Sequence, residues 1–475
     1  MIDLKVTTGG GEYVRLVSRW CPPVLPLVSS SFIEAPCESI PRLRHKSEPA
    51  VRELSPILPR DDGDAGDAQG RINTNRWGGF CSACRAGRTL TMEQLTIGVV
   101  ASSRKEHERR LPLHPRHLDE IDRELRSRML LEEGYGELFG VPDKELAERV
   151  GGLLPRGRLL READAVILPK PVAEDVAAMR EGQILCGWVH LVQDPTLTQL
   201  AIDRRLTVIA WEAMNLWSDD GSFQVHVFHG NNELAGYCSV LHAMQLRGLT
   251  GEYGRQLRAA VVSFGATGRG AVTALMAMRV RRISGLTRRH VEAVVDPIHG
   301  VEMLTFARDP DHPSQPLELE GPHETVAEFL AEHDLIVNCM LQDTDRPLVF
   351  VRREELDLFE PGTLFIDVAC DPEMGFEWAR PTTFSEPLFD VGGGRFNYGV
   401  DHSPSLMWDS ATWEISRALI PHLDALMSGP DGWSESDTIR RAVEVRGGRV
   451  LNPRVLSFQR RSSDFPHELR HRGGS

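Results

Sequence analysis

Short apolar runs alternate with amphipathic stretches from about residue 94 onward, which is the pattern of an α/β protein. The runs are rich in Val, Ile and Leu, as expected for strands that are buried on both faces of a parallel sheet. We predict strands over residues 95–100, 163–168, 183–189, 206–211, 259–262, 283–286, 335–340 and 363–368, and helices over 195–204, 233–246 and 271–278. This alternation predicts two Rossmann-like, doubly wound lobes with the active site in the cleft between them.

The pattern also suggests where the domains begin and end. Residues 1–93 are rich in Pro, Ser, Gly and Arg and lack periodicity, so we interpret them as a disordered or non-native extension. The other expected segments are a substrate lobe at 94–225 completed by 405–428, an NAD(P)-binding Rossmann domain at 226–404 with a proline- and acid-rich insertion at 300–325, and a polar C-terminal tail at 429–475.

Composition narrows the function classes. The 475 residues carry a net charge of −14, which does not favour a nucleic-acid or anionic-membrane partner. No apolar stretch approaches the roughly 20 residues that span a bilayer, so we expect a cytoplasmic protein without a membrane partner. Cys81 and Cys84 are spaced like half a zinc site, but the second pair is missing, so we predict incidental thiols and no metal.

A glycine turn carries the strongest chemical signal. Residues 263–270 read Ser-Phe-Gly-Ala-Thr-Gly-Arg-Gly, between an apolar run and a helical pattern. Such a turn brings backbone N–H groups to the pyrophosphate of a dinucleotide. The expected cofactor-binding residues are Ser263, Gly265, Ala266, Thr267, Gly268, Arg269, Gly270, Thr287, Arg288 and Arg289. An acid usually follows the second strand of an NAD site, whereas two arginines suit the 2′-phosphate of NADP.

Other polar residues follow predicted strands, where catalytic groups of open α/β sheets collect. His190 ends the strand at 183–189, Lys170 follows the one at 163–168, and Asp371 follows the one at 363–368. Arg109 and Arg110 follow the first strand. An acid–base group, fixed cations and a carboxylate at strand ends suit a small carboxylate substrate beside a nicotinamide.

The order of these motifs resembles the alanine dehydrogenase and nicotinamide transhydrogenase superfamily over residues 94–427. The motifs that carry the resemblance are Glu108-Arg109-Arg110, Lys170-Pro171, Val189-His190-Leu191, Ala210-Trp211-Glu212, Asn231-Asn232-Glu233, the glycine turn and Ala369-Cys370-Asp371. One branch, carboxyethylornithine synthase, is similar in further detail. Its shared motifs are Gly187-Trp188-Val189-His190, Asp343-Thr344-Asp345-Arg346 and Val400-Asp401-His402-Ser403.

The resemblance implies residue roles. His190, Asp371 and Lys170 would be catalytic, with the imidazole titrating near neutrality. Arg110 and Lys170 would hold a keto-acid carboxylate. The candidates for the amino-acid pocket are Trp188, Trp211, Glu212, Glu233, Asp401 and His402, with Glu212 or Asp401 pairing with an α-ammonium group.

The activity that the resemblance implies is an NADPH-dependent condensation of pyruvate with the side-chain amine of ornithine or a similar amino acid. NADH remains open as the cofactor. The partners would be small-molecule substrates, in a homo-oligomer. Two alternatives stay open: an alanine dehydrogenase reaction that uses NAD(H) and ammonia, and a non-catalytic nucleotide-binding sensor. Ser263, which replaces the first glycine of the G-x-G-x-x-G pattern, is the main departure.

Overall fold

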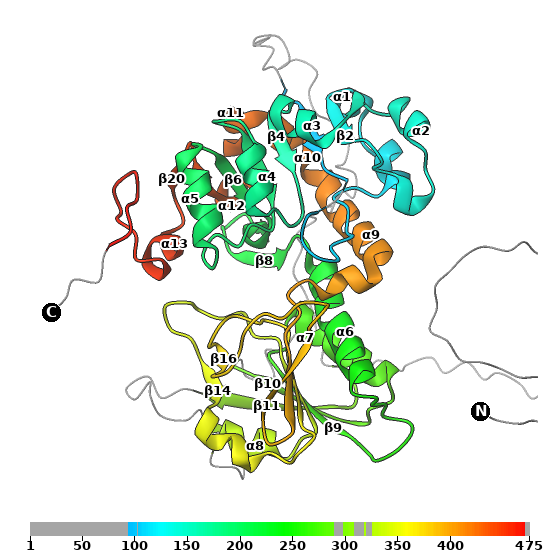
Figure 1. The fold of residues 1–475 in the computed structure, drawn as a ribbon, viewed down its shortest axis with the longest axis vertical. Coiled ribbons are helices and arrows are strands. Elements are labelled where there is room, and N and C mark those ends of the chain that lie inside the picture. The colour runs from blue at the N-terminus through cyan, green and yellow to red at the C-terminus, as the bar shows by residue number, and fades with distance from the viewer. Residues whose placement is uncertain (1–93, 102, 289–297, 308–317, 320–324, 471–475) are drawn as a thin grey trace, which may run out of the picture. The chain divides into compact units, whose positions relative to one another are not determined.

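Most strands of the chain form two large sheets, each eight-stranded in the part of the chain that the computed structural model describes. The structure describes residues 94–101, 103–288, 298–307, 318–319 and 325–470. The expected extension at residues 1–93, which includes Cys81 and Cys84, and the cofactor candidate Arg289 lie outside the described residues. Each sheet is flanked by helices (Figure 1).

The first sheet has the strand order β20-β19-β6-β5-β4-β1-β2-β3. Its strands are β1 (Ile97–Val99), β2 (Met129–Glu132), β3 (Gly152–Leu154), β4 (Ala165–Ile167), β5 (Ile184–Gly187), β6 (Thr207–Ala210), β19 (Val443–Arg446) and β20 (Arg449–Val450). The helices between the first six strands are α1 (Arg123–Ser127), α2 (Asp143–Ala147), α3 (Arg156–Glu162), α4 (Ala173–Ala178) and α5 (Pro195–Asp203). Strands β1 to β6 are parallel and follow the 3-2-1-4-5-6 order of a Rossmann sheet.

The second sheet has the order β12-β11-β10-β9-β13-β15-β18-β17. Its six parallel strands, β11-β10-β9-β13-β15-β18, repeat the Rossmann order. Its strands are β9 (Arg258–Val262), β10 (Arg282–Thr287), β11 (Val301–Ala307), β12 (Glu318–Leu319), β13 (Leu335–Asn338), β15 (Leu364–Asp367), β17 (Leu388–Gly392) and β18 (Arg395–Tyr398). The main helices are α6 (His229–Leu246), α7 (Ala266–Ala277) and α8 (Val326–Ala331). Two small ribbons pair β7 (Asn215–Trp217) with β8 (Phe223–His226) and β14 (Val349–Val351) with β16 (Gly375–Phe376).

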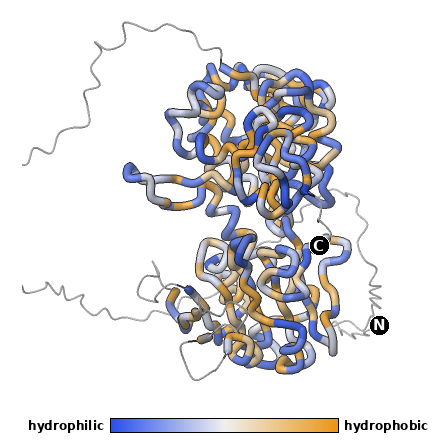
Figure 2. The backbone as a smooth tube through the Cα atoms, turned by 90° about the vertical axis from the view of Figure 1, so that its left-hand side faces the viewer, coloured by the Kyte–Doolittle hydropathy of each residue, from blue (hydrophilic) through white to orange (hydrophobic). Residues whose placement is uncertain are grey.

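Alternate side chains of the central strands enter separate apolar cores on the two faces of each sheet. In the first sheet Ile97 and Ile167 pack into one core, while Val166 and Val208 pack into the other. Apolar segments accordingly run through the interior of the fold (Figure 2). Helices α9 (Trp408–Leu419), α10 (Leu423–Met427) and α12 (Asp437–Ala442) return to cover the first sheet. The prediction of two doubly wound α/β lobes is confirmed, because every predicted strand lies in one of the two sheets.

Two expectations about the polar segments are wrong. Residues 301–307 are not an insertion, because β11 pairs in parallel with β10 and completes the Rossmann order. Residues 429–470 are not a separate tail, because β19 pairs with β6 and α13 (Pro453–Phe458) follows it. Arg461 and His467 are buried at 4% and 3% exposure. Strand β11 is followed by proline- and acid-rich sequence, and β19 is only four residues long and includes Glu444 and Arg446, so the surrounding composition concealed both strands.

Candidate active site

Four polar residues follow neighbouring strands of the first sheet at its carboxyl edge. Arg110 follows β1, Lys170 follows β4, His190 follows β5 and Glu212 lies in the 3₁₀ turn after β6. Parallel strands end at the same edge, so residues far apart in the chain meet there. Arg110 and Lys170 are both buried, which is unusual for cations unless they are paired.

Lys170 and His190 form the centre of the group. The Lys170 ammonium donates a hydrogen bond to His190 Nε2 at 2.9 Å, so the neutral ring carries its proton on Nδ1. His190 has a φ of 46°, a strained conformation that is common at functional sites. Its side chain remains 45% exposed, whereas that of Lys170 is 10% exposed. The imidazole is therefore open to a ligand and the lysine beside it is not.

The ionisation of this pair differs from the expectation. Desolvation, together with the neighbouring Lys170 ammonium, holds the pKa of His190 well below its usual value. Desolvation likewise lowers the pKa of Lys170, although Asp401 opposes that change. The shift at His190 favours the neutral ring, whereas the resemblance implies an imidazole that titrates near neutrality, and the catalytic role of His190 stays a prediction. A neutral His190 can accept a proton at Nε2 once the Lys170 ammonium gives up its hydrogen bond to that atom.

Arg110 is held by a buried carboxylate. Its Nε and Nη2 atoms donate to the two oxygens of Glu108 at 2.9 and 2.5 Å, and its Nη1 atom donates to Asn231 Oδ1 at 3.1 Å. Ser405 Oγ donates to Glu108 at 2.7 Å. Burial alone would raise the pKa of Glu108, but Arg110 and Ser405 bring it down to about 2. These contacts fix the plane of the guanidinium.

The two predicted tryptophans support this arrangement from below. Arg110 lies over the ring of Trp188 at 5.0 Å, and Trp188 packs edge-on against Trp211 with centroids 4.8 Å apart. Both rings are buried, at 6% and 0% exposure. Trp188 therefore contacts the Arg110 guanidinium in the structure, and its predicted contact with substrate stays a prediction.

Glu212 lies behind His190. Its Oε1 atom accepts a hydrogen bond from the His190 backbone N–H at 2.6 Å. Burial and the nearby Glu444 carboxyl raise the pKa of Glu212 to about 8. Glu444 comes from β19, so the segment expected to be a polar tail supplies a group that acts on the site. A Glu212 side chain that is protonated at neutral pH is a poor partner for an ammonium group.

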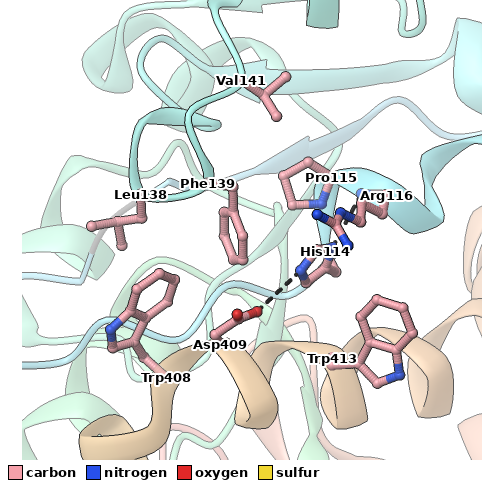
Figure 3. A pocket seen from close by; sticks show the side chains of 9 residues that line it. All are labelled: His114, Pro115, Arg116, Leu138, Phe139, Val141, Trp408, Asp409 and Trp413. Carbon is pink, nitrogen blue, oxygen red and sulfur yellow. Dashed lines mark hydrogen bonds and ion pairs between the residues drawn. The ribbon is translucent and has the colours of Figure 1, made fainter. Parts of the chain in front are cut away.

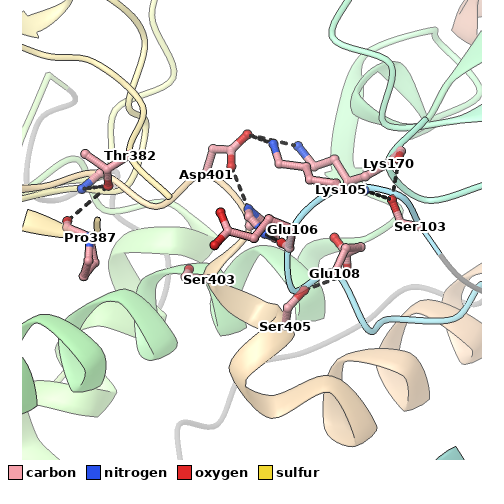
Figure 4. A network of polar contacts seen from close by, with 12 residues as sticks. Ser103, Lys105, Glu106, Glu108, Lys170, Thr382, Pro387, Asp401, Ser403 and Ser405 are labelled. Carbon is pink, nitrogen blue, oxygen red and sulfur yellow. Dashed lines mark hydrogen bonds and ion pairs between the residues drawn. The ribbon is translucent and has the colours of Figure 1, made fainter. Parts of the chain in front are cut away.

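Asp401 meets the cations from the second half of the chain (Figure 4). It forms an ion pair with Lys105, lies 4.0 Å from Lys170 Nζ, and accepts from His402 Nδ1 at 2.7 Å. Burial would raise its pKa, but Lys170 and the His402 hydrogen bond hold the pKa well below its usual range. Asp401 is therefore an ionised carboxylate beside the Lys170–His190 pair.

Asp371 approaches from the loop after β15. Gln193, in the loop after β5, donates to Asp371 Oδ1 at 3.2 Å, and burial raises the pKa of Asp371. Asp367, at the end of β15, accepts from the Cys370 backbone N–H at 3.1 Å and so supports this loop. Cys370 itself has a φ of 45°. The structure thus links Asp371 to the loop that carries His190.

Sequence reasoning missed Lys105 and Glu108 as site residues. Lys105 is one of only five lysines in the chain, a rarity that gave a usable signal. Glu108 lies two residues before Arg110, but an acid next to two arginines reads as a surface pair until its burial is known. Glu444 gave no signal, since its contact with the site depends on the pairing of β19 with β6.

The glycine turn connects β9 to α7. Ser263 occupies the place of the first fingerprint glycine with a φ of 77°, the left-handed conformation that the turn requires. A Cβ atom built on Gly265, the N-cap of α7, meets no atom within 4 Å. Ala266 and Thr267 follow in the first turn of α7. An open helix N-terminus of this kind fits a pyrophosphate, so the residues present suit a dinucleotide.

Two further glycines of the turn face protein instead. A Cβ atom on Gly268 would lie 2.2 Å from the carbonyl oxygen of Ser263, and one on Gly270 would lie 1.8 Å from that of Glu233. Gly268 therefore lets α7 approach the strand, and Gly270 lets α6 and α7 touch. Arg269 lies over the ring of Phe264 at 5.1 Å. The predicted roles of these residues toward the cofactor stay predictions.

The end of β10 carries the residues expected near the adenosine ribose. Thr287, the last residue of β10, is buried and Arg288 is exposed. The described residues have no acid at this strand end. Arg288 therefore provides a cation where an NAD site usually has a carboxylate.

A pair of Rossmann lobes with a glycine turn and polar groups at strand ends is typical of nicotinamide-dependent oxidoreductases. The pattern of the alanine dehydrogenase/PNT N-terminal domain matches residues 98–228, and that of the C-terminal domain matches residues 255–453. The chain belongs to the alanine dehydrogenase/PNT family and is an oxidoreductase of that family.

Individual relatives have two different activities. N(5)-(carboxyethyl)ornithine synthase of Lactococcus lactis subsp. lactis is 24% identical over 323 residues, which cover 66% of this chain and 90% of the relative. Alanine dehydrogenase of Mycobacterium tuberculosis (strain CDC 1551 / Oshkosh) is 24% identical over 375 residues, which cover 76% and 96%. Equal identities leave the particular reaction undecided.

Solved structures agree on the fold. An L-alanine dehydrogenase has a TM-score of 0.59 at 20% identity, with 76% of this chain and 98% of the other covered. A transhydrogenase from Sinorhizobium meliloti has a TM-score of 0.54 at 19% identity, with 75% and 99% covered. Across the described residues, no helix has the length and apolar character needed to cross a membrane.

Proposed function

We propose that the protein catalyses an NADPH-dependent reductive condensation of pyruvate with the side-chain amine of ornithine or a similar amino acid. The amine and the keto carbon form an imine with loss of water, and hydride and proton addition give an N-carboxyethyl amino acid. The observation that carries the proposal is the end of β10, where Arg288 stands in place of an acid. A site that prefers NADPH serves reductive synthesis.

The keto acid would bind at the carboxyl edge of the first sheet. The Arg110 guanidinium, fixed by Glu108, offers a planar fork to the carboxylate. Lys170 would hold the carbonyl oxygen and polarise it. Lys170 is fixed from two sides, since its ammonium contacts His190 and its backbone carbonyl accepts from Ser103 Oγ at 2.8 Å.

Proton transfer falls to two groups. A neutral His190 accepts the proton released at the carbinolamine and returns one as water leaves. Asp371, whose pKa burial raises, accepts a proton from the attacking amine. Gln193 orients Asp371 from the same loop that carries His190. These assignments rest on the contacts of Lys170 and Asp371 described above.

Asp401 is the better partner for the ammonium group of the second substrate. It remains ionised, whereas the pKa of Glu212 is raised to about 8. Lys105 contacts Asp401, so an incoming ammonium would replace that lysine. This exchange of one cation for another leaves the carboxylate paired at each stage.

The cofactor would lie along the glycine turn, with its pyrophosphate at Gly265 and the N-terminus of α7, and with Arg288 and Arg289 at the 2′-phosphate. The reduced nicotinamide supplies the hydride. A 2′-phosphate carries two negative charges that an exposed arginine attracts.

Alanine dehydrogenase chemistry with NAD(H) is the second candidate. It is supported by the similarity to the Mycobacterium tuberculosis alanine dehydrogenase, of which the match covers 96%. The two reactions differ in their amine.

Purified protein is supplied with pyruvate and NADPH, with either ornithine or ammonia, and NADPH absorbance is followed. We expect oxidation with ornithine and none with ammonia alone, and no oxidation by the His190→Ala variant. Oxidation with ammonia alone contradicts the proposal. Absence of NADPH oxidation with either amine, in the parent protein as in His190→Ala, would support the sensor alternative.

A further inference from the structure

A pocket lies in the first lobe beside α9, apart from the residues of the active site. Its volume is about 320 Å³, within the range of small-molecule sites. Its lining combines aromatic rings with one carboxylate and one guanidinium: His114, Pro115, Arg116, Leu138, Phe139, Val141, Trp408, Asp409 and Trp413 (Figure 3). The proposed reaction uses none of these residues.

Asp409 is the polar centre of this pocket. The His114 Nδ1 atom accepts a hydrogen bond from the Arg116 backbone N–H at 3.1 Å, so the neutral ring carries its proton on Nε2. That Nε2–H donates to Asp409 Oδ1 at 3.2 Å. His114 thus orients the carboxylate, while 65% of the Asp409 side chain remains exposed. An oriented, accessible carboxylate suits an ammonium group.

Aromatic rings form the walls on both sides of Asp409. Figure 3 shows Trp408 and Trp413 on either side of it, with Phe139 facing them from another element. Phe139 packs edge-on against Trp408 with centroids 5.2 Å apart and against His114 at 4.4 Å. Trp413 also lines the pocket, and 36% of its surface remains exposed, so its indole ring is accessible to a ligand. Such rings accept an apolar side chain, and their faces also attract cations.

We propose that this pocket is a binding site for a free α-amino acid with an aromatic or large apolar side chain. Asp409 binds the ammonium group, Arg116 binds the carboxylate, and Trp408, Trp413 and Phe139 enclose the side chain. A zwitterion needs both charges within one pocket, and this lining supplies them. The binding itself does not rest on the proposed reaction.

The site is joined to Arg110 by two segments. Residues 108–114 carry both Arg110 and His114, and residues 405–413 carry both Ser405 and Asp409. Across these segments Ser405 donates to Glu108 at 2.7 Å, and the Leu111 backbone N–H donates to Thr412 Oγ1 at 3.0 Å. A ligand that shifts the start of α9 therefore acts on the carboxylate that fixes Arg110. Occupancy of the pocket is coupled to keto-acid binding, reciprocally.

The test is calorimetric titration of the full chain with L-phenylalanine, without cofactor or keto acid. Phenethylamine, which lacks the carboxylate, and 3-phenylpropionate, which lacks the ammonium, serve as ligand controls. We expect saturable binding of L-phenylalanine with a Kd below about 10 mM, and binding at least fivefold weaker for each control ligand. Asp409→Asn and Trp413→Ala should each weaken L-phenylalanine binding at least fivefold.

Asp431→Asn, an exposed carboxylate outside the pocket, is the matched control and should bind like the parent protein. Circular dichroism checks that each variant is folded. If Asp409→Asn is not folded, Arg116→Gln provides a second pocket variant. Absence of saturable binding, or equal binding by the parent protein and folded pocket variants, overturns the proposal. Binding without any change in pyruvate affinity overturns the coupling alone. Failure of pyruvate to react with ornithine leaves the binding result standing, so the two proposals fail separately.

Discussion

Replacing Glu108 with Gln tests the way in which the fold holds Arg110. The Glu108 side chain is fully buried, and its carboxylate accepts hydrogen bonds from Arg110 and Ser405. The lowering of its pKa from 4.5 to about 2 corresponds to about 3 kcal/mol of favourable interaction with the ionised form. Glu108→Gln removes that charge and leaves the buried Arg110 guanidinium without a countercharge. We therefore expect the free energy of unfolding to fall by about 3 kcal/mol at pH 7.

The pH dependence gives the sign of the effect. A carboxyl whose pKa is depressed in the folded state stabilises the protein above its ordinary pKa and loses that contribution as pH falls through the folded value. The difference between the parent protein and Glu108→Gln should therefore be full above about pH 5 and should shrink toward pH 2. Urea unfolding at a series of pH values measures it. Glu435→Gln, an exposed carboxylate, should change stability by less than about 0.5 kcal/mol.

The same variant has a functional readout. A guanidinium without its buried partner loses its fixed plane, so the KM for pyruvate should rise about tenfold or more at pH 7. Two results refute the reasoning: an unfolding free energy equal to that of the parent protein, or a stability loss that stays constant from pH 7 to acid. Either result means that Glu108 does not hold Arg110 as an ionised carboxylate.

Three further predictions follow from the described contacts. Arg288→Ala should raise the KM for NADPH about tenfold and leave the KM for NADH unchanged. The control variant Arg282→Ala, at the other end of β10, should change neither KM. Equal effects of Arg288→Ala on the two cofactors contradict a role at the 2′-phosphate. Lys170→Met should lower turnover by about 100-fold or more. Because the ammonium lowers the pKa of His190, the same variant should move the acid limb of the kcat/KM profile to higher pH. An unmoved limb means that the Lys170 ammonium does not lower the pKa of His190. Burial raises the pKa of Asp367 from 3.8 to about 7, so the native state loses stability as pH rises between these values. The free energy of unfolding of Asp367→Asn should therefore rise by about 2 kcal/mol relative to the parent protein between pH 5 and 8. A difference between the two proteins that stays constant over this range in urea unfolding contradicts the prediction.

The sequence predicts the central strands and much of the site, because these depend on local patterns. Buried parallel strands read as continuous apolar runs, and the loops that follow them read as motifs. Lys170 and His190 were placed after adjacent strands, and the structure brings them within 2.9 Å. Strand order is not encoded in this alternation, because different doubly wound orders use strand–helix–strand units of the same hand.

The remaining features depend on contacts that no local pattern encodes. Strand β11 is only partly buried and lies next to the edge strand β12, and the proline- and acid-rich residues that follow it in the sequence favour an insertion. Strand β19 returns from the end of the chain to pair with β6, and this pairing alone brings Glu444 to Glu212. The lowered pKa of His190 likewise depends on burial and on the Lys170 ammonium beside it, and both become visible only in three dimensions.

The most direct test of the proposed reaction is the mass of its product. Purified protein is incubated with carbon-13-labelled pyruvate, ornithine, ammonia and either NADPH or NADH, and the products are identified by mass spectrometry. The proposal predicts labelled N-carboxyethyl ornithine, formed faster with NADPH than with NADH, and no product from Lys170→Met beyond a trace. Labelled alanine as the main product, formed with NADH, would contradict it.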